Sequence, residues 1–302
     1  MAVRVQGVGH YWGSLRALDG LTFEVGRGEI FGVAGPDGAG KTTLMRILSA
    51  VADPSEGDVW IGGRHTLRDP GGVHDITGYV CQTTGLYPDL TVSENISFFG
   101  RIRGVPRKDV KSRAGRLLEA TGLAAFTGRR AAALSGGMKQ KLALVCSLLH
   151  TPEVLILDEP TNGVDPVSRR EFWQILSDLV RSGVTAVLAT TYLEEADRCH
   201  RSCLLHGGRV VDVGSPAEIR RRSGLRIAEI SGFARPAELA SVLRKIPGLT
   251  VSIRSGNVRI AAAGPEHIEA ASAEARRFCG SGISVIPEEP TLEDVLAAGA
   301  GA

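Results

Sequence analysis

The stretch GPDGAGKTT, at residues 35–43, has the residue types and spacing of a loop that binds nucleotide phosphates. Its glycines allow the backbone to curl, so that successive N–H groups converge on phosphate oxygens. The Lys41 ammonium can reach the β- and γ-phosphates, and the Thr42 hydroxyl can take a coordination position of Mg²⁺. The residues expected to contact the nucleotide are Gly35, Pro36, Asp37, Gly38, Ala39, Gly40, Lys41, Thr42 and Thr43.

Two carboxylates follow an apolar run in VLILDEP, at residues 154–160. Asp158 ends the run and can hold Mg²⁺ directly or through water. Glu159 comes next, where a carboxylate can orient or deprotonate an attacking water. The alternative is an acidic pair that faces solvent at the end of a strand. With the glycine loop also present, the pair predicts a hydrolase of nucleoside triphosphates.

The stretch ALSGGMKQKLAL, at residues 133–144, is a second candidate anion site. Ser135, Gly136 and Gly137 precede a helical pattern, so a hydroxyl and exposed N–H groups would gather at the positive end of a helix. The stretch lacks the lysine–threonine ending of the first loop. An ordinary capped helix is the alternative, since serine is a preferred N-cap residue, and both interpretations can hold together.

An alternation of strands and helices must position these residues. Strands are predicted at 28–35, 76–82, 154–158, 184–190 and 203–206. Helices are predicted at 41–50, 107–121, 136–150, 166–182 and 192–199. Such an alternation indicates an α/β fold with a mainly parallel sheet and helices on both faces. The segment before it, RVQGVGHYWGSLRALDGLTFEVG, alternates like an antiparallel edge sheet.

The composition of the chain shifts near Arg222, and the remainder reads as a small α+β domain. Its predicted element order over 225–287 is β-α-β-β-α-β, which is typical of a ferredoxin-like arrangement. A short helix is expected at 290–298. We therefore expect two domains, 1–222 and 223–302, and nothing in the second suggests chemistry.

The composition argues against several classes of partner. The chain has 302 residues, with 35 basic and 33 acidic side chains, a formal net charge of +2. This near balance argues against binding to nucleic acid. No apolar run approaches the ~18 residues needed to span a bilayer, and the N-terminus lacks a signal pattern. We expect a cytoplasmic protein that reaches a membrane only through a partner.

The segment LSGGMKQ and the later segment LILDEPTNGVDP together resemble the ATPase subunits of ABC transporters. The resemblance covers roughly residues 3–215. It implies a P-loop NTPase fold with an antiparallel N-terminal subdomain and a helical subdomain at about 83–150, and it implies ATP and Mg²⁺ as cofactors. In that family the LSGG segment of one subunit binds the γ-phosphate of ATP held by the other. The second ATPase subunit, identical or different, is therefore an expected partner.

The resemblance assigns further residues. Gln82 matches a glutamine that contacts Mg²⁺ and the attacking water, and Asp165 matches the segment that crosses the dimer interface. Trp12 matches the aromatic residue that stacks on adenine, with Tyr11 as the alternative. Residues 83–102 resemble the surface that receives membrane-spanning permease subunits, which would hold the chain at the cytoplasmic face of the cell membrane.

The phrase LYPDLTVSENISFF and the ending PTLEDVLAA are similar to ATPases that export drugs, antibiotics or lipid-linked substrates. Two positions depart from the family. Tyr192 stands where a histidine is usual near the γ-phosphate, and Asp37 stands where asparagine is more usual. Our hypothesis is that the two changes compensate, through a Tyr192 hydroxyl that satisfies Asp37 or a bridging water. The alternatives to a homodimeric exporter are a slow or regulatory half of a heterodimer and a soluble ABC ATPase that acts on ribosomes or DNA.

Overall fold

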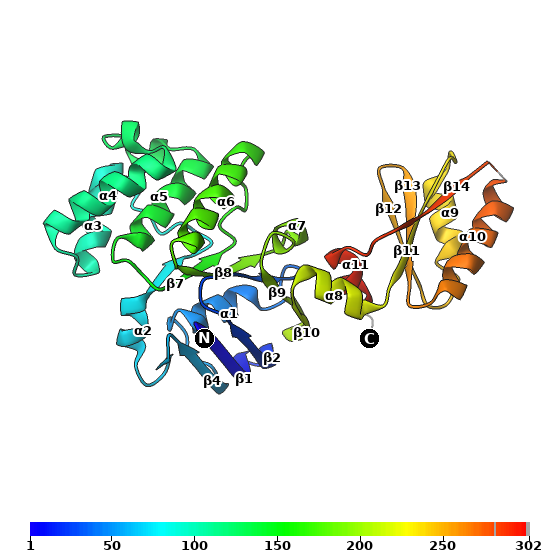
Figure 1. The fold of residues 1–302 in the computed structure, drawn as a ribbon, viewed down its shortest axis with the longest axis horizontal. Helices are drawn as coiled ribbons and strands as arrows, with labels where there is room; N and C mark the ends of the chain where they lie inside the picture. The colour runs from blue at the N-terminus through cyan, green and yellow to red at the C-terminus, as the bar shows by residue number, and fades with distance from the viewer. Residues whose placement is uncertain (281, 300–302) are drawn as a thin grey trace. The chain divides into compact units, whose positions relative to one another are not determined.

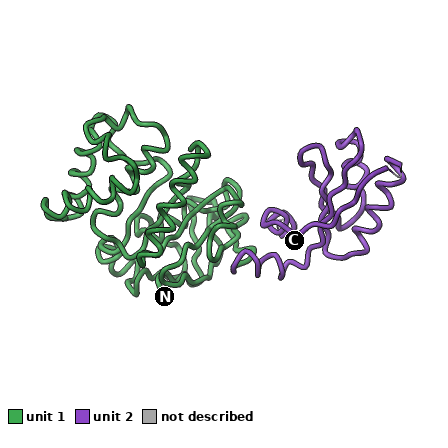
Figure 2. Tube along the Cα trace, turned by 45° about the horizontal axis from the view of Figure 1, so that its top comes forward, with its two compact units in different colours: residues 1–213 green, residues 214–302 purple. Residues whose placement is uncertain are grey.

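The computed structural model describes residues 1–280 and 282–299 and divides the chain into two compact units, Met1–Val213 and Gly214–Ala302 (Figure 2). The division falls before the boundary expected at residue 222, so that α8 (Pro216–Ser223) belongs to the second unit. Each unit has a hydrophobic core of its own. Each is described here by itself.

The central sheet of the first unit has the strand order β10-β9-β3-β8-β7-β6 (Figure 1). Its strands are β3 (Ile30–Ala34), β6 (Thr77–Val80), β7 (Val154–Asp158), β8 (Thr185–Thr190), β9 (Arg201–His206) and β10 (Arg209–Gly214). The pairs from β9 across to β6 are parallel, which confirms the mainly parallel sheet. Strands β3, β7 and β8 are buried at every position, because helices cover both faces of the sheet.

The two faces of the sheet carry different helices. Ile156 packs in a cluster with α1 (Lys41–Leu48), whereas the next residue, Leu157, packs in a cluster with α5 (Gly136–Leu148) and α6 (Pro166–Arg181). Successive side chains of a strand point to opposite faces. The helix that follows the phosphate loop and the helix that begins at Gly136 therefore cover opposite faces of one sheet (Figure 1).

The N-terminal sheet has the order β2-β1-β4-β5, and its paired strands are antiparallel, as expected. Its strands are β1 (Val3–Trp12), β2 (Leu15–Val25), β4 (Glu56–Ile61) and β5 (Arg64–His65). Apolar residues of β1, β2 and β4 join the same core cluster as α1. This sheet therefore fixes the end of β1 near the start of α1. Helix α2 (Pro70–Ile76) follows and leads into β6.

Helices α3 (Val92–Ile102) and α4 (Arg107–Thr121) pack with α5 around a third apolar cluster. Helix α3 begins with a capping box, in which Thr91 and Glu94 satisfy each other's backbone N–H groups. Within the described parts of the chain, no helix has both the length and the apolarity required to cross a bilayer.

The second unit carries a sheet of order β12-β13-β11-β14, with antiparallel pairs throughout. Its elements are β11 (Arg226–Ser231), α9 (Pro236–Leu243), β12 (Leu249–Arg254), β13 (Asn257–Ala262), α10 (Pro265–Cys279), β14 (Ser284–Glu288) and α11 (Leu292–Gly299). The β-α-β-β-α-β order agrees with the order read from the sequence. Helices α9 and α10 cover one face of this sheet through a single apolar cluster.

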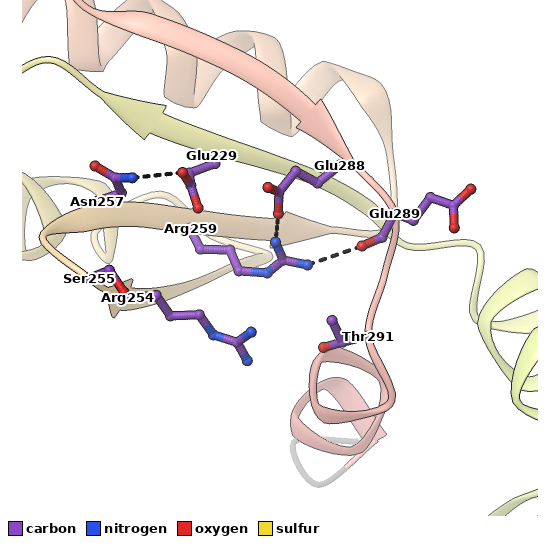
Figure 3. Close-up of a pocket in the computed structure, with 8 residues that line it drawn as sticks. All are labelled: Glu229, Arg254, Ser255, Asn257, Arg259, Glu288, Glu289 and Thr291. Carbon is purple, nitrogen blue, oxygen red and sulfur yellow. Dashed lines mark hydrogen bonds and ion pairs between the residues drawn. The ribbon is translucent and has the colours of Figure 1, made fainter. Parts of the chain in front are cut away.

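Arg259 of β13 points away from that cluster and is buried under α11. Its guanidinium contacts the Glu288 carboxylate and the backbone oxygen of Glu289 (Figure 3). It also contacts the Asp294 carboxylate at 2.9 Å. Asp294 also accepts hydrogen bonds from the backbone and the hydroxyl of Thr291, at the start of α11. This buried ion pair therefore fastens the last helix to the sheet.

Candidate nucleotide site

The phosphate loop joins the buried end of β3 to α1, and its glycines are required by the backbone. A Cβ atom on Gly35 would lie 2.1 Å from the backbone oxygen of Leu205. Gly40 has φ +100°, and a Cβ there would lie 2.5 Å from the backbone oxygen of Ala17. Gly40 is the N-cap of α1 and offers no side-chain cap. The positive end of α1 is thus left for an anion.

Lys41 lies inside this loop and is 4% exposed. Its Nζ donates hydrogen bonds to the backbone oxygens of Gly35 (3.0 Å) and Pro36 (2.9 Å). The same Nζ lies 3.3 Å from Oε1 of Glu159. The Lys41 ammonium therefore forms an ion pair with Glu159, the carboxylate that the sequence predicts to be the catalytic base.

Thr42 and Asp158, the two residues expected to hold Mg²⁺, are in contact with each other. Thr42 Oγ1 donates to Oδ1 of Asp158 at 3.1 Å. The other carboxylate oxygen of Asp158, Oδ2, is buried and has no hydrogen-bond partner among residues 1–280 and 282–299. Burial raises the pKa of Asp158 above its ordinary value, and the hydrogen bond from Thr42 acts in the opposite direction. A buried, unpartnered carboxylate oxygen beside a hydroxyl fits Mg²⁺, which prefers hard oxygen ligands.

Glu159 follows β7 with an uncommon backbone, at φ +50°. Its N–H donates to the backbone oxygen of Ala189 on the neighbouring strand, at 3.0 Å. Its Oε2 accepts a hydrogen bond from Nδ2 of Asn162 at 3.1 Å. A left-handed conformation at a glutamate costs about 1–3 kcal/mol and is typical of functional sites. The two contacts therefore hold a strained backbone and a buried carboxylate in place.

Tyr192 lies just past β8 and is the N-cap of α7 (Leu193–Ala196). Its ring stacks with the guanidinium of Arg169, with Cζ 4.4 Å from the ring centre. Its hydroxyl donates to Oδ1 of Asn162 at 3.5 Å. Asp37 is exposed at the phosphate loop. The hydroxyl is therefore directed to the neighbour of Glu159, and the expected direct bond from Tyr192 to Asp37 is not the one observed.

The two aromatic residues at the end of β1 point in different directions. Trp12 Nε1 donates to Thr43 Oγ1 at 3.2 Å, which brings the indole to the first turn of α1. Tyr11 packs instead under the guanidinium of Arg16, with Cζ 5.4 Å from the ring centre. Trp12 is about half exposed, so a face of the indole is open to a ligand. Of the two aromatic residues, Trp12 is thus the one that contacts α1 directly after the phosphate loop.

The LSGG turn lies at the N-terminus of α5. Ser135 is the N-cap residue, and its Oγ accepts a hydrogen bond from the backbone N–H of Met138 at 3.3 Å. Ser135 and Gly136 are exposed, whereas Gly137 is buried. A Cβ on Gly137 would lie 2.5 Å from Cβ of Ser168 on α6. The glycine thus permits close packing of α5 on α6, while the serine side of the turn remains open.

Two further predicted residues lie at the edges of the site. Gln82 is exposed, two positions beyond the end of β6. Asp165 is the exposed N-cap of α6, and its Oδ1 accepts from the N–H groups of Val167 (3.0 Å) and Ser168 (2.9 Å). Hydrogen bonds with Ser168 lower the pKa of Asp165.

Comparison with known proteins identifies the family. Residues 18–162 match the family described as ABC transporter. The daunorubicin resistance ATP-binding protein DrrA3 of Streptomyces coeruleorubidus is 36% identical over 300 residues, which is 98% of this chain and 94% of that protein. This chain belongs to the ABC transporter family.

Other relatives of this ABC protein differ in length. The probable multidrug ABC transporter ATP-binding protein YbhF of Escherichia coli (strain K12) is 44% identical over 200 residues, or 66% of this chain, and the chain spans 35% of the length of YbhF. Among solved structures, the dimeric, post-hydrolysis ATP-binding cassette MJ0796, bound to ADP and Pi, is 26% identical with a TM-score of 0.64. That match covers 70% of this chain and 98% of the cassette, which supports the fold described above.

Sequence reasoning missed three residues of the ABC protein's site. Asn162 lies between Glu159 and Tyr192, and Thr161 and Glu195 form a buried contact behind it. Asn162 is three positions after Glu159 in the segment DEPTN, so its nearness was the available signal. Glu195 had none, because two adjacent glutamates in LEEAD read as a solvated first turn of a helix.

Proposed function

We propose that this ABC protein is the ATP-binding subunit of an exporter, which hydrolyses ATP with Mg²⁺ in a head-to-tail dimer. Separate membrane subunits would carry a drug-, antibiotic- or lipid-like substrate. The names of DrrA3 and YbhF, a daunorubicin resistance protein and a probable multidrug transporter protein, support export. The match to DrrA3 extends through the second unit.

The observation that carries this proposal is the separation of two half-sites. The phosphate loop leads into α1 on one face of the central sheet, and the open Ser135 turn begins α5 on the other face. Each half offers a helix N-terminus to an anion. A second cassette in head-to-tail orientation would bring its Ser135 turn to the phosphate bound at Lys41. The nucleotide would then complete one site from two chains.

The Lys41–Glu159 contact suggests an order for nucleotide binding and hydrolysis. Arrival of a triphosphate draws the Lys41 ammonium towards the β- and γ-phosphates, away from its 3.3 Å contact with Glu159. The released carboxylate, still held by Asn162, can then accept a proton from the attacking water. The triphosphate would thus compete with Glu159 for Lys41, and its binding would free the carboxylate to act as a base.

Thr42 and Asp158 are the residues that would hold Mg²⁺, with Gln82 at the edge of the site. The metal would supply charge neutralisation to the β- and γ-phosphate oxygens. The buried Oδ2 atom of Asp158 would gain the partner it lacks. This would offset the desolvation of the carboxylate, which is the main cause of its raised pKa.

The surface expected to receive the permease carries an aromatic cluster. Tyr87 lies 4.4 Å from Phe98 and 6.3 Å from Phe99, measured between ring centres, and Tyr87 is about half exposed. Aromatic residues are enriched at protein interfaces. Docking of a membrane subunit over residues 83–102 would place the chain at the cytoplasmic face of the membrane as a peripheral subunit.

The proposal is tested with purified protein. We expect wild-type chain to hydrolyse ATP in the presence of Mg²⁺, and Lys41→Ala to lose nucleotide binding. Glu159→Gln should slow hydrolysis by roughly 10²-fold or more, as for loss of a general base, and should accumulate an ATP-dependent dimer. Light scattering after size exclusion measures the dimer. A Glu159→Gln chain that remains monomeric with ATP and Mg²⁺ would contradict the homodimer and would leave a heterodimeric partner as the alternative.

A surface substitution separates dimerisation from binding. Ser135→Arg, made in the Glu159→Gln background, should abolish the ATP-dependent dimer while each monomer still binds nucleotide. Ser112→Arg on α4 is the matched control, because Ser112 is also an exposed serine but lies outside the α5 turn. Equal dimerisation of the two arginine variants would argue against the Ser135 turn as half of the site.

A further inference from the structure

Glu195 is a buried carboxylate that the proposed chemistry does not use. It lies on α7 and is 3% exposed. Its Oε1 accepts from Thr161 Oγ1 at 2.6 Å and from Trp173 Nε1 at 3.3 Å, and its Oε2 accepts from Thr190 Oγ1 at 2.8 Å. The donors come from the loop after β7, from α6 and from the end of β8. One side chain thus joins three elements.

Two of these donors belong to loops that border the nucleotide site. Thr161 lies two residues after Glu159. Thr190 is the last residue of β8, and its Oγ1 also accepts from the backbone N–H of Tyr192 at 3.0 Å. Because the Thr190 hydroxyl donates to Glu195 and accepts from Tyr192, the position of each of these two groups restricts the position of the other. The carboxylate therefore fixes the Glu159 loop and the Tyr192 turn relative to each other.

The hydrogen bond between Glu195 and Thr161 affects Glu159 through Asn162. Asn162 follows Thr161 directly, and its Nδ2 holds Oε2 of Glu159 at 3.1 Å. The backbone N–H of Asn162 also donates to the backbone oxygen of Glu159, at 3.2 Å. Fixing Thr161 therefore fixes the amide that aims Glu159. Small misplacements of a catalytic group have large effects, since about 1 Å can cost 10²-fold in rate.

The burial of an acid here is costly, and its contacts offset that cost. A carboxylate removed from water needs strong hydrogen bonds or a counter-charge. Glu195 has the three donors and a partly buried cation, Arg169, with Nε 3.9 Å from Oε1. The same Arg169 stacks on Tyr192. A plain apolar side chain would fill the core without those costs, but it could not hold two hydroxyls at fixed positions.

We propose that Glu195 is a positioning residue for hydrolysis, which sets the orientation of Glu159 through Thr161 and Asn162 and couples it to the turn at Tyr192. This inference rests on the proposed function. It adds a buried residue whose carboxylate is held by Thr161, Trp173 and Thr190 and would act through these neighbours.

Single isosteric substitutions test the hydrogen bonds that Glu195 accepts from Thr161 and Thr190. Thr161→Val and Thr190→Val remove one hydroxyl each and keep the volume, at positions that are both 1% exposed. We expect kcat for ATP hydrolysis to fall about tenfold in each, while KM for ATP changes less than twofold, because the phosphate loop is untouched. The double variant should be no slower than the slower single variant, since both act through Glu195.

Thr185→Val is the matched control. Thr185 begins β8, is 2% exposed, and accepts a hydrogen bond from the backbone N–H of Gly28 at 3.0 Å. The same substitution therefore removes a side-chain hydrogen bond from the same strand, at the end far from Glu159. We expect it to lower the melting temperature as much as Thr190→Val does and to leave kcat within twofold of wild type.

A second readout does not depend on turnover. Hydrogen exchange of the backbone over 159–164 should speed up in Thr161→Val and in Glu195→Ala, and not in Thr185→Val. Glu195→Gln keeps the side-chain volume and one carbonyl acceptor, so it should retain more of the wild-type kcat than Glu195→Ala. The Trp173 indole N–H resonance should shift in both Glu195 variants, because Glu195 is its acceptor.

The outcomes separate the two proposals. If wild-type protein hydrolyses ATP and Thr161→Val does so within twofold of it, with unchanged exchange over 159–164, the positioning role is wrong and the proposed function stands. An equal loss of kcat in Thr185→Val would also overturn the role, because a general loss of stability would then suffice. If wild-type protein shows no Mg²⁺-dependent hydrolysis, the proposed function fails and the inference fails with it.

Discussion

Asp158 shows at the residue scale how a functional site is kept at the expense of stability. Its carboxylate is buried, Oδ2 has no partner among the described residues, and burial raises its pKa. We expect Asp158→Asn to stabilise the nucleotide-free chain by roughly 0.5–2 kcal/mol, since it removes a desolvated charge and keeps an acceptor for Thr42. The same variant should lose Mg²⁺-dependent hydrolysis. Thermal unfolding and an ATPase assay measure the two effects, with the exposed Asp178→Asn as a control that changes neither.

The effect of Asp158 should depend on pH with a defined sign. Because its pKa is raised in the folded chain, the contribution of Asp158 to stability is present below the unfolded pKa, about 3.9 for aspartate, and is lost as pH rises through the folded pKa. The stability gained by Asp158→Asn should therefore be largest near neutral pH and should shrink on acidification. A gain that stays constant from pH 7 to pH 4 would show that desolvation of the charge is not its cause.

The sequence predicted the residues of the site better than their partners. Lys41, Thr42, Asp158 and Glu159 stand in motifs whose spacing reflects one loop and one strand end, and the structure brings these four together. Side-chain partners across elements depend on which face a residue takes. For this reason the Asn162 partner of Tyr192 could not be read from the sequence, and the roles of Gln82 and Tyr192 remain proposals.

Asn95 illustrates the element scale, because one side chain fastens a loop to the start of a helix. It is fully buried on α3. Its Oδ1 accepts from the N–H of Tyr87 at 2.9 Å, and its Nδ2 donates to the backbone oxygens of Tyr87 (3.0 Å), Leu90 (3.2 Å) and Thr91 (3.0 Å). The loop has no regular structure, so these bonds define the surface that we propose for permease docking.

We expect Asn95→Ala to destabilise the first unit by roughly 2–4 kcal/mol, from about 1 kcal/mol for each hydrogen bond that its Oδ1 and its two amide N–H groups make. Hydrogen exchange over residues 86–91 should rise sharply, and recovery of the chain with membranes should fall. Ser97→Ala is the control, since Ser97 lies on the same helix and its exposed hydroxyl donates to the backbone oxygen of Ser93 within that helix. Unchanged protection of 86–91 in Asn95→Ala would show that the loop is held by other contacts.

The pattern of elements was largely readable from the sequence, for a physical reason. Buried parallel strands are continuous apolar runs, so β7 and β8 stand out, and alternation of apolar and polar residues marks β12 in the second unit. Element ends were less readable. Helix α7 ends at Ala196, whereas the sequence predicts a helix over 192–199, because terminal turns depend on local contacts.

At the scale of the whole molecule, two units with separate cores should unfold separately. Arg259 and Asp294 belong only to the second unit, where both are buried. We expect Asp294→Asn to lower the unfolding transition of the second unit by about 3–5 kcal/mol in stability, as for breaking a buried pair, and to leave the first unit unchanged. Calorimetry, with nucleotide added to mark the first unit, distinguishes the two transitions. A joint shift of both would indicate that the units unfold as one.

The stability that the Arg259–Asp294 ion pair supplies should also disappear in acid. Burial alone raises the pKa of Asp294, but hydrogen bonds from Arg259 and Thr291 outweigh it and lower the pKa below its ordinary value. The stability it supplies is therefore present above the unfolded pKa and is lost as pH falls through the folded value. The difference between wild type and Asp294→Asn should narrow below about pH 4.

The ion pair between Lys41 and Glu159 has a consequence for which anions this cassette binds. The phosphate loop and the end of β7 together carry one cationic side chain, Lys41, and three acidic ones, Asp37, Asp158 and Glu159. The N-terminus of α1 attracts any anion, but bare sulfate or inorganic phosphate would leave the surplus of carboxylates uncompensated, so such abundant ions should bind more weakly than nucleotide with its cation. A polyphosphate that arrives with its own divalent cation cancels the surplus. The charges of these four side chains would thus select against common anions before the adenine ring makes any contact.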